Sequence, residues 1–265
     1  MSGLLRSELR KIFTTRLWWG LLIGLVVTWA LLSLLQGLIA GQSTGGGAAP
    51  LPGLDNPATV RSVYTGGLDY ARIFALAFGI IAMAGEYRQQ TITATVLGSP
   101  RRSRVVVSKV AGVALTGLGY GVVGVVTGLL VGVPIILARH GALHLTSDDV
   151  PRALVAAAAA VALWAVVGLG VGTLIRNQIV ALLVAIGVAW IAEPLLAVGL
   201  NAAHAGKVAQ YLPSMATSAL TSPETSQGGV VVTILPWWAG ALVLIGYAVV
   251  SGGLGAALTL RRDIS

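Results

Sequence analysis

Three ionisable residues, Asp69, Arg72 and Glu193, lie within otherwise apolar stretches of the sequence. Charged side chains are costly in hydrocarbon, so they usually pair with one another or line a wet cavity. Two carboxylates beside a cation are groups with which an embedded enzyme could perform acid–base chemistry on a lipid or a peptide. Pro194 follows Glu193 directly, and because proline has no backbone N–H we expect a helix to kink or end there.

Other patterns that could bind a metal or a nucleotide are incomplete. His140 and His144 are four residues apart beside Asp148 and Asp149, a spacing that could hold a metal, although we favour a polar loop. Residues 119–124 (GYGVVG) match the dinucleotide-binding pattern, but they lie in an apolar stretch without a preceding strand. The chain has no cysteine, no phosphate-binding loop and no serine-hydrolase elbow. We therefore expect no catalytic residues, cofactor or metal in this chain.

The composition indicates an integral membrane protein. Hydrophobic residues make up 56% of the 265 residues and charged residues 10%, whereas a soluble domain carries roughly 25% charged residues. So few charges cannot cover an apolar core of this size in water. This excludes a soluble enzyme, a disordered tail and a nucleic-acid-binding domain, although the net charge is +8.

Six segments are long and apolar enough to cross a bilayer, which takes about 20 helical residues. They are 17–40, 64–85, 110–138, 153–175, 179–200 and 234–260. The second is the weakest, so five spans with a re-entrant second segment is the alternative. The first is too long for the apolar region of a cleaved signal peptide, and we expect it to be retained.

Charge distribution predicts the orientation of these spans. With six spans both termini share one side, and most of the 17 basic residues fall on that side, whereas most of the 9 acidic residues fall on the other. Basic residues mark the cytoplasmic side of membrane proteins. We therefore predict a multi-pass protein with both termini in the cytoplasm.

Two cytoplasmic segments carry further information. Residues 2–16 form an amphipathic pattern typical of a helix that lies in the membrane interface, where it serves as an anchor or as a docking surface for a cytosolic partner. Glu8 falls on its apolar face, three residues from Lys11, with which it can pair. Residues 86–104 contain a polar stretch of about two helical turns, a Gly-Ser-Pro stop and a basic cluster. By charge alone this loop is an ordinary turn on the cytoplasmic side.

Together these segments resemble the type-2 ABC transporter permeases. The resemblance rests on SELRKIFTTR (7–16) before the first span, GEYRQQTITATVLGSPRR (85–102) before the third, and EPLL (193–196) followed by YLPSMATSAL (211–220) before the sixth. It implies one all-α permease domain over residues 1–265, with an interfacial helix at 2–16, a cytoplasmic coupling loop at 86–104 and external re-entrant helices within 201–233.

The resemblance also implies partners and a function. The chain would pair with a second permease copy or a paralogue and with two cytosolic ABC ATPase subunits, which bind ATP and Mg²⁺. The complex would export a hydrophobic or amphipathic compound, such as a drug, antibiotic, peptide or lipid-like molecule, across a bacterial plasma membrane. Two alternatives remain, a membrane-embedded enzyme acting on lipid or peptide and a non-transporting scaffold or immunity protein.

Candidate site residues follow from the resemblance by position. The coupling helix would be 90–97, and the ATPase-coupling residues would be Glu86, Arg88, Gln90, Thr91, Ile92, Thr93, Thr95, Val96, Leu97, Arg101 and Arg102, supported by Glu8, Lys11 and Arg16 of the interfacial helix. A translocation path or gate would involve Phe74, Phe78, Met83, Trp190 and Glu193. The alternative for the aromatic and methionine residues is contact with lipid or neighbouring helices. For Glu193 it is a structural role, as a cap of the re-entrant helices or a partner of Arg72.

Glycines recur at helix-packing spacing within the spans. They are Gly20 and Gly24; Gly117 and Gly121; Gly124, Gly128 and Gly132; and Gly168 and Gly172. Small residues at this spacing let helix backbones approach closely in lipid, so we expect these glycines to lie at helix–helix contacts.

Overall fold

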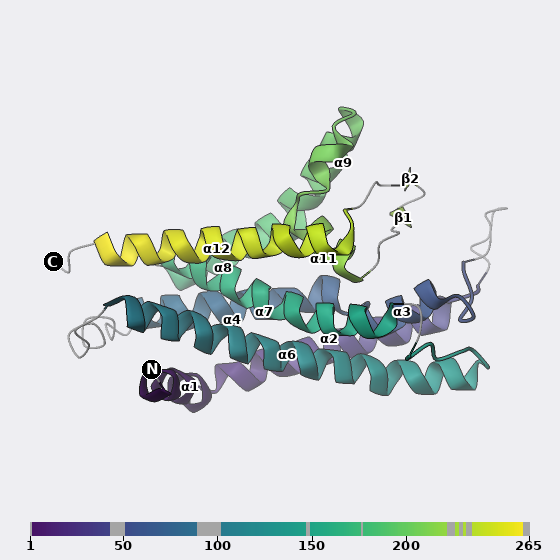
Figure 1. Cartoon of the computed structure of the whole chain (residues 1–265), viewed down its shortest axis with the longest axis horizontal. Helices are drawn as coiled ribbons and strands as arrows, with labels where there is room; N and C mark the ends of the chain where they lie inside the picture. The colour runs from purple at the N-terminus through teal and green to yellow at the C-terminus, as the bar shows by residue number, and fades with distance from the viewer. Residues whose placement is uncertain are drawn as a thin grey trace.

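The chain is described by a computed structural model that covers residues 2–42, 51–88, 102–146, 149–175, 177–221, 226–227, 230–231 and 235–261. Almost all of this is helical, and Figure 1 shows the long helices running side by side along the long axis of the molecule. The helices are α1 (Ser2–Thr14), α2 (Leu17–Ile39), α3 (Pro57–Thr65), α4 (Leu68–Arg88), α6 (Arg102–Ala138), α7 (Val150–Leu174), α8 (Gln178–Gly187), α9 (Glu193–Ala202), α10 (Gly206–Ala209), α11 (Pro213–Thr221) and α12 (Trp237–Arg261), with a π-helical turn η1 (Val188–Ala192) between α8 and α9.

Five helical stretches are long and apolar enough to cross a membrane. They are Leu17–Ile39, Pro57–Gly85, Val105–Ala138, Val150–Leu174 and Gln178–Ala202. They coincide with the first five predicted spans, and the second is served by α4, a helix unbroken from Leu68 to Arg88. Within α12 the stretch Trp237–Gly253 is apolar but shorter. The prediction of an all-helical fold is therefore confirmed, with five helical stretches long and apolar enough to span a membrane.

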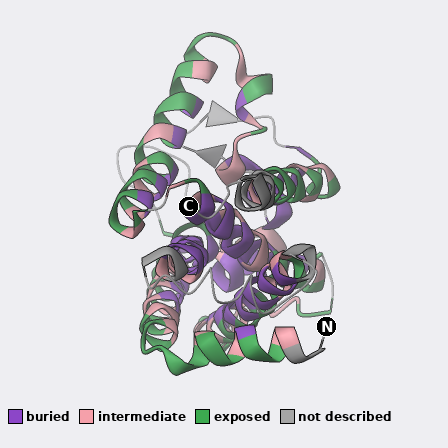
Figure 2. Cartoon of the chain, turned by 90° about the vertical axis from the view of Figure 1, so that its left-hand side faces the viewer, coloured by how far each residue is buried: buried purple, intermediate pink, exposed green. Residues whose placement is uncertain are grey.

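The amphipathic α1 lies across the bundle rather than along it, as Figures 1 and 2 both show. The end of α12 lies at the same end of the molecule as α1 (Figure 1), and Arg6, Arg10, Lys11 and Arg16 make this end basic. We call it the basic end, and we call the opposite end, which carries α3, the α3 end.

Helices α4 and α7 form the centre of the bundle, and α7 also packs against α6 and α12. Figure 2 shows these buried segments surrounded by helices with exposed outer faces. Gly168 and Gly172 of α7 lie against the backbone of α4, and a Cβ built on Gly172 would lie 2.7 Å from the carbonyl oxygen of Ile80. The glycine contacts predicted from spacing are confirmed except at Gly20, where a Cβ would meet nothing within 4 Å.

Polar residues at helix ends explain where several short helices begin. The side chain of Asn56 accepts a hydrogen bond from the Ala58 N–H at 2.8 Å and caps α3. Asn177 caps α8 in the same way through the N–H of Ile179 at 3.0 Å. The region 201–233, predicted to be re-entrant, contains α10, α11 and a pairing of two-residue strands, β1 (Ser226–Gln227) and β2 (Val230–Val231), which the sequence did not indicate.

The helix does not end at Pro194, because the backbone hydrogen bonds change register just before it. The N–H of Glu193 donates to the carbonyl oxygen of Val188, five residues back, so η1 is a π-helical turn. Single π-helical turns are frequent at functional sites. Beyond η1, α9 projects away from the bundle (Figure 1). The helical path therefore continues past Pro194, with a π-helical turn directly before it instead of an end.

Candidate functional site

Most of the predicted coupling residues fall outside the described residues, and the others belong to helix ends at the basic end. Residues 90–97 and Arg101 are not among the residues that the structure describes. Glu86 and Arg88 belong to the last turn of α4, and Arg102 is the first residue of α6. Their role in coupling stays a prediction, and the described part places them where α4 ends and α6 begins.

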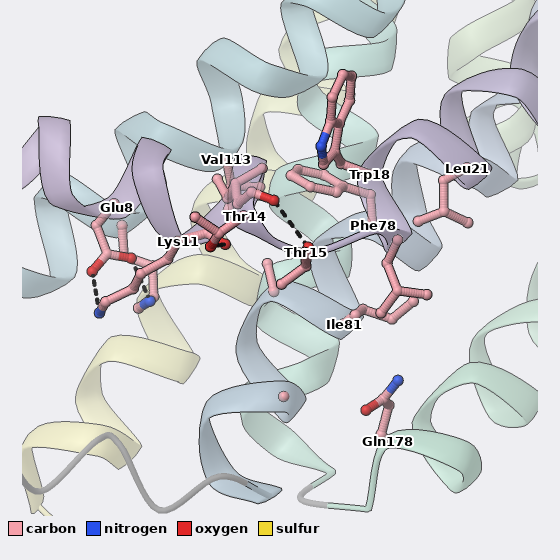
Figure 3. Close-up of a pocket in the computed structure, with 15 residues that line it drawn as sticks. Glu8, Lys11, Thr14, Thr15, Trp18, Leu21, Phe78, Ile81, Val113 and Gln178 are labelled. Atoms are coloured by element: carbon pink, nitrogen blue, oxygen red, sulfur yellow. Dashed lines mark hydrogen bonds and ion pairs between the residues drawn. The ribbon is translucent and has the colours of Figure 1, made fainter.

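Glu8 forms the centre of an ion cluster at this end, shown in Figure 3. Its carboxylate accepts a hydrogen bond from Lys11 Nζ at 2.8 Å and another from Lys109 Nζ at 2.7 Å. Lys11 comes from the same helix, as predicted, whereas Lys109 comes from α6. Glu8 is 5% exposed and Lys109 9% exposed, so the contact between α1 and α6 is buried. Arg16, the third predicted residue, is exposed at the turn between α1 and α2.

Electrostatics keeps Glu8 ionised in this position. Burial by itself would raise the pKa of Glu8, but the charges and hydrogen bonds of Lys109 and Lys11 together lower it below its ordinary value. Glu8 and Lys109 are the two buried charges of this cluster. Removal of one of them would leave the other as a poorly compensated charge in a buried position, which is strongly destabilising. The ion cluster therefore ties α1 to the beginning of α6.

A small cavity of about 260 Å³ lies beside this cluster, between α1 and the bundle. Its wall includes the polar side chains of Thr14, Thr15 and Gln178 and the apolar side chain of Phe78 (Figure 3). The Phe78 ring packs against Tyr120 with 5.3 Å between centroids, and Tyr120 donates its hydroxyl hydrogen to the carbonyl oxygen of Trp18.

The predicted translocation residues do not share one surface within this chain. Phe78 and Met83 are buried in the core of the bundle, and Phe74 is partly buried against it. Trp190, in contrast, is 54% exposed on η1. Contact with neighbouring helices, the alternative considered for these side chains, describes Phe74, Phe78 and Met83 in this chain. Their involvement in a path stays a prediction.

The three intramembrane charges come together nearer the α3 end. Arg72 is 5% exposed, its Nε donates to the carbonyl oxygen of Asp69 at 2.8 Å, and its guanidinium lies 4.7 Å from the ring centre of Trp164. The carboxylates of Asp69 and Glu193 both act on Arg72 electrostatically. Glu193 is itself 5% exposed and accepts a hydrogen bond from the Ser214 N–H at 3.1 Å.

The contact between Glu193 and Ser214 has a structural meaning. Ser214 is the second residue of α11, whose first N–H groups have no partner within the helix. A carboxylate there satisfies one donor and interacts favourably with the helix dipole. This supports the structural alternative for Glu193, namely that it caps a re-entrant helix and interacts with Arg72.

A cavity of about 860 Å³ opens beside this charge cluster. Helix α4 contributes Asp69 and Tyr70, η1 contributes Trp190, and α9 and α11 complete the wall with Asn201 and Ser218, among others. The rings of Tyr70 and Trp190 are 6.4 Å apart and meet edge to face. The structure therefore places Trp190, but not the other predicted path residues, on this cavity.

The charged residues of the cluster differ in how they lie relative to the cavity. Of the two carboxylates, Glu193 is buried and holds α11, so Asp69 is left to face the cavity. Within the described residues, no three His, Cys, Asp or Glu side chains are grouped closely enough to hold a metal ion.

Several residues of these clusters were not found from the sequence. Lys109 was recognised only as a basic residue of the predicted cytoplasmic side, and Trp164 and Ser214 gave no signal at all. Lys109 lies 101 residues from Glu8, so no local spacing connects them. The usable signal was the presence of an isolated carboxylate on the apolar face of α1, which requires a buried cationic partner.

Comparison with known proteins identifies no relative. No protein-family model matches the chain, and no curated protein sequence matches it significantly.

Proposed function

We propose that this chain is the permease subunit of an ATP-binding-cassette exporter, with α12 as a sixth span and the basic end in the cytoplasm. One observation carries the proposal: the buried Glu8 ties the amphipathic α1 to Lys109, about two helical turns from the start of α6. The chain between α4 and α6, which holds the predicted coupling helix, leads into the same end of α6.

This arrangement suits a subunit that receives force from a partner. A cytosolic ATPase docked on residues 90–97 would push on the end of α4 and the start of α6. Because α1 is ion-paired to α6, it would move with them, and the push would be distributed over the membrane interface. Two ATPase subunits would supply ATP binding and hydrolysis, and a second permease copy or a paralogue would complete the path. The cargo would be a hydrophobic or amphipathic compound.

The proposal is tested by purification of the chain from the membranes of its native host. We expect an ATPase with a phosphate-binding loop to co-purify, and we expect it to be lost when residues 90–97 are replaced by a Gly/Ser linker of eight residues. The matched control replaces residues 43–50, also eight residues, in the loop predicted on the other side, and should retain the ATPase. Retention of the ATPase by the 90–97 variant would contradict the proposed coupling site, and absence of any ATPase from the unmodified chain would contradict the function.

A further inference from the structure

We propose that the 860 Å³ cavity near the α3 end binds an amphipathic organic cation, with Asp69 as its counter-ion. This inference names the chemical class of the cargo. It rests on the proposed function, because the ligand is taken to be the compound that is transported. The cavity is bounded by α4 on one side and by η1, α9 and α11, which follow 100 or more residues later in the sequence, on the other.

The sign of the ligand follows from which charges the cavity presents. Arg72, the one cation of the cluster, is 5% exposed and its Nη1 is fully buried, because the guanidinium lies against the Trp164 ring. Glu193 is equally buried, and both carboxylates act on Arg72 electrostatically. Asp69 is exposed and lines the cavity. Asp69 and Arg72 both line the cavity, but the exposed carboxylate, rather than the buried guanidinium, is the charge that a ligand can reach.

Asp69 also retains most of its capacity to accept a ligand. Its carboxylate is 3.5 Å from Ser218 Oγ, at the limit of hydrogen-bonding distance. The backbone carbonyl of Asp69, rather than its carboxylate, accepts the hydrogen bond from Arg72 Nε. A carboxylate in an apolar segment that accepts only so long a hydrogen bond is expected to bind a cation when one is available.

The remaining wall indicates the shape of the ligand. Tyr70 and Trp190 are both exposed, 51% and 54%, and offer aromatic faces to which cations are attracted. Ile191, Pro194, Met215 and Val198 add apolar surface. A cavity of about 860 Å³ lies within the size range of sites for drug-sized molecules, roughly 300–1,000 Å³. An aromatic or aliphatic body that carries one positive charge meets all of these features.

The test uses two ions of the same shape and opposite charge, tetraphenylphosphonium and tetraphenylborate. The full chain is placed in nanodiscs of neutral phosphatidylcholine without an ATPase, and binding is measured by equilibrium dialysis against empty nanodiscs. We expect saturable binding of the cation and none of the anion. Asp69→Asn removes the negative charge and should weaken cation binding by about tenfold or more. A tenfold change in affinity corresponds to about 1.4 kcal/mol. Asp69→Glu should retain cation binding.

Three further variants keep the result interpretable. Asp55→Asn removes an exposed carboxylate that does not line the cavity and should leave cation binding unchanged. Trp190→Ala should weaken cation binding and Trp190→Phe should preserve it, and because Trp190 is 54% exposed we expect both variants to fold. Equal binding of the two ions, or equal affinity of the Asp69→Asn and unmodified chains, would overturn the inference. Because no ATPase is present, that outcome would leave the co-purification test of the proposed function unaffected.

Discussion

Replacement of Glu8 by glutamine is expected to release α1 from α6 without unfolding the bundle. The carboxylate has two partners of unequal burial, since the side chain of Lys109 is 10% exposed and that of Lys11 is 42% exposed. Breaking a buried ion pair from one side costs about 3–5 kcal/mol, whereas an exposed pair contributes about 0–1 kcal/mol. Because glutamine still accepts a hydrogen bond, we expect the lower limit, about 3 kcal/mol, to apply.

The absence of cysteine from the chain makes this release measurable by thiol labelling. Val113 of α6 is 1% exposed and lines the cavity beneath α1, so a cysteine at this position should react with a polar maleimide only when α1 moves away. A change of about 3 kcal/mol corresponds to an increase of about a hundredfold in labelling rate. Lys109→Met should have a similar effect, and Lys11→Met should raise the rate less than about fivefold.

A second cysteine distinguishes local release from global unfolding. Val161 is fully buried in α7, in the centre of the bundle, and labelling of a cysteine there should be unchanged in the Glu8→Gln variant. If Lys109→Met and Lys11→Met raised labelling at position 113 equally, burial would not decide the strength of these pairs and the reasoning would be wrong. It would be equally wrong if Glu8→Gln accelerated labelling at both cysteine positions to the same extent.

Three other predictions concern pH, packing and capping. The pKa of Glu8 is lowered in the folded chain, so its contribution to stability is complete above its ordinary value of 4.5 and is lost as the pH falls below it; the difference in labelling rate between wild type and Glu8→Gln should shrink there. Gly168→Ala should destabilise the chain by about 1–3 kcal/mol in thermal or detergent unfolding because its Cβ would meet the α4 backbone, whereas Gly20→Ala should not destabilise it. Glu193→Gln should lower thermal stability by about 1–2 kcal/mol through the weakened cap of α11 and leave ATP-driven export intact; lost export at unchanged stability would favour a gating role instead.

The helices could be predicted because their causes are local. Long apolar runs, the small residues at spacing of four and the amphipathic pattern of α1 each follow from a few neighbouring residues, and the structure has helices at these places. The pair between Glu8 and Lys11 is local for the same reason. Gly20 shows the limit of such reasoning, since its spacing matches Gly24 but only Gly24 faces another helix.

Both charge clusters depend on contacts between distant segments. The sequence identified Asp69, Arg72 and Glu193 as costly charges, but it did not indicate that Glu193 holds α11 while Asp69 remains exposed. That distinction depends on Ser214, which lies 21 residues beyond Glu193. The cavity could not be predicted either, because its wall is assembled from four separate helical elements and includes Trp190 only through the π-helical turn.

Helix α4 runs from the charge cluster of Asp69 and Arg72 to the basic end. Its first turns carry Asp69 and Arg72, and its last turn ends at the basic end, beside the chain that would dock an ATPase. With 21 residues it spans about 30 Å. In its middle, α4 approaches α7 closely at Gly79, Gly168 and Gly172. At these glycines the nearest atoms of the facing helix are backbone atoms, so the contact cannot be relieved by a change of side-chain rotamer. Close-packed interiors transmit displacement rather than absorb it. In the proposed transporter a push on the end of α4 would therefore move α4 and α7 together and reach the wall of the cation cavity. Gly79→Leu should separate the two helices and uncouple ATP hydrolysis from export while the ATPase stays bound.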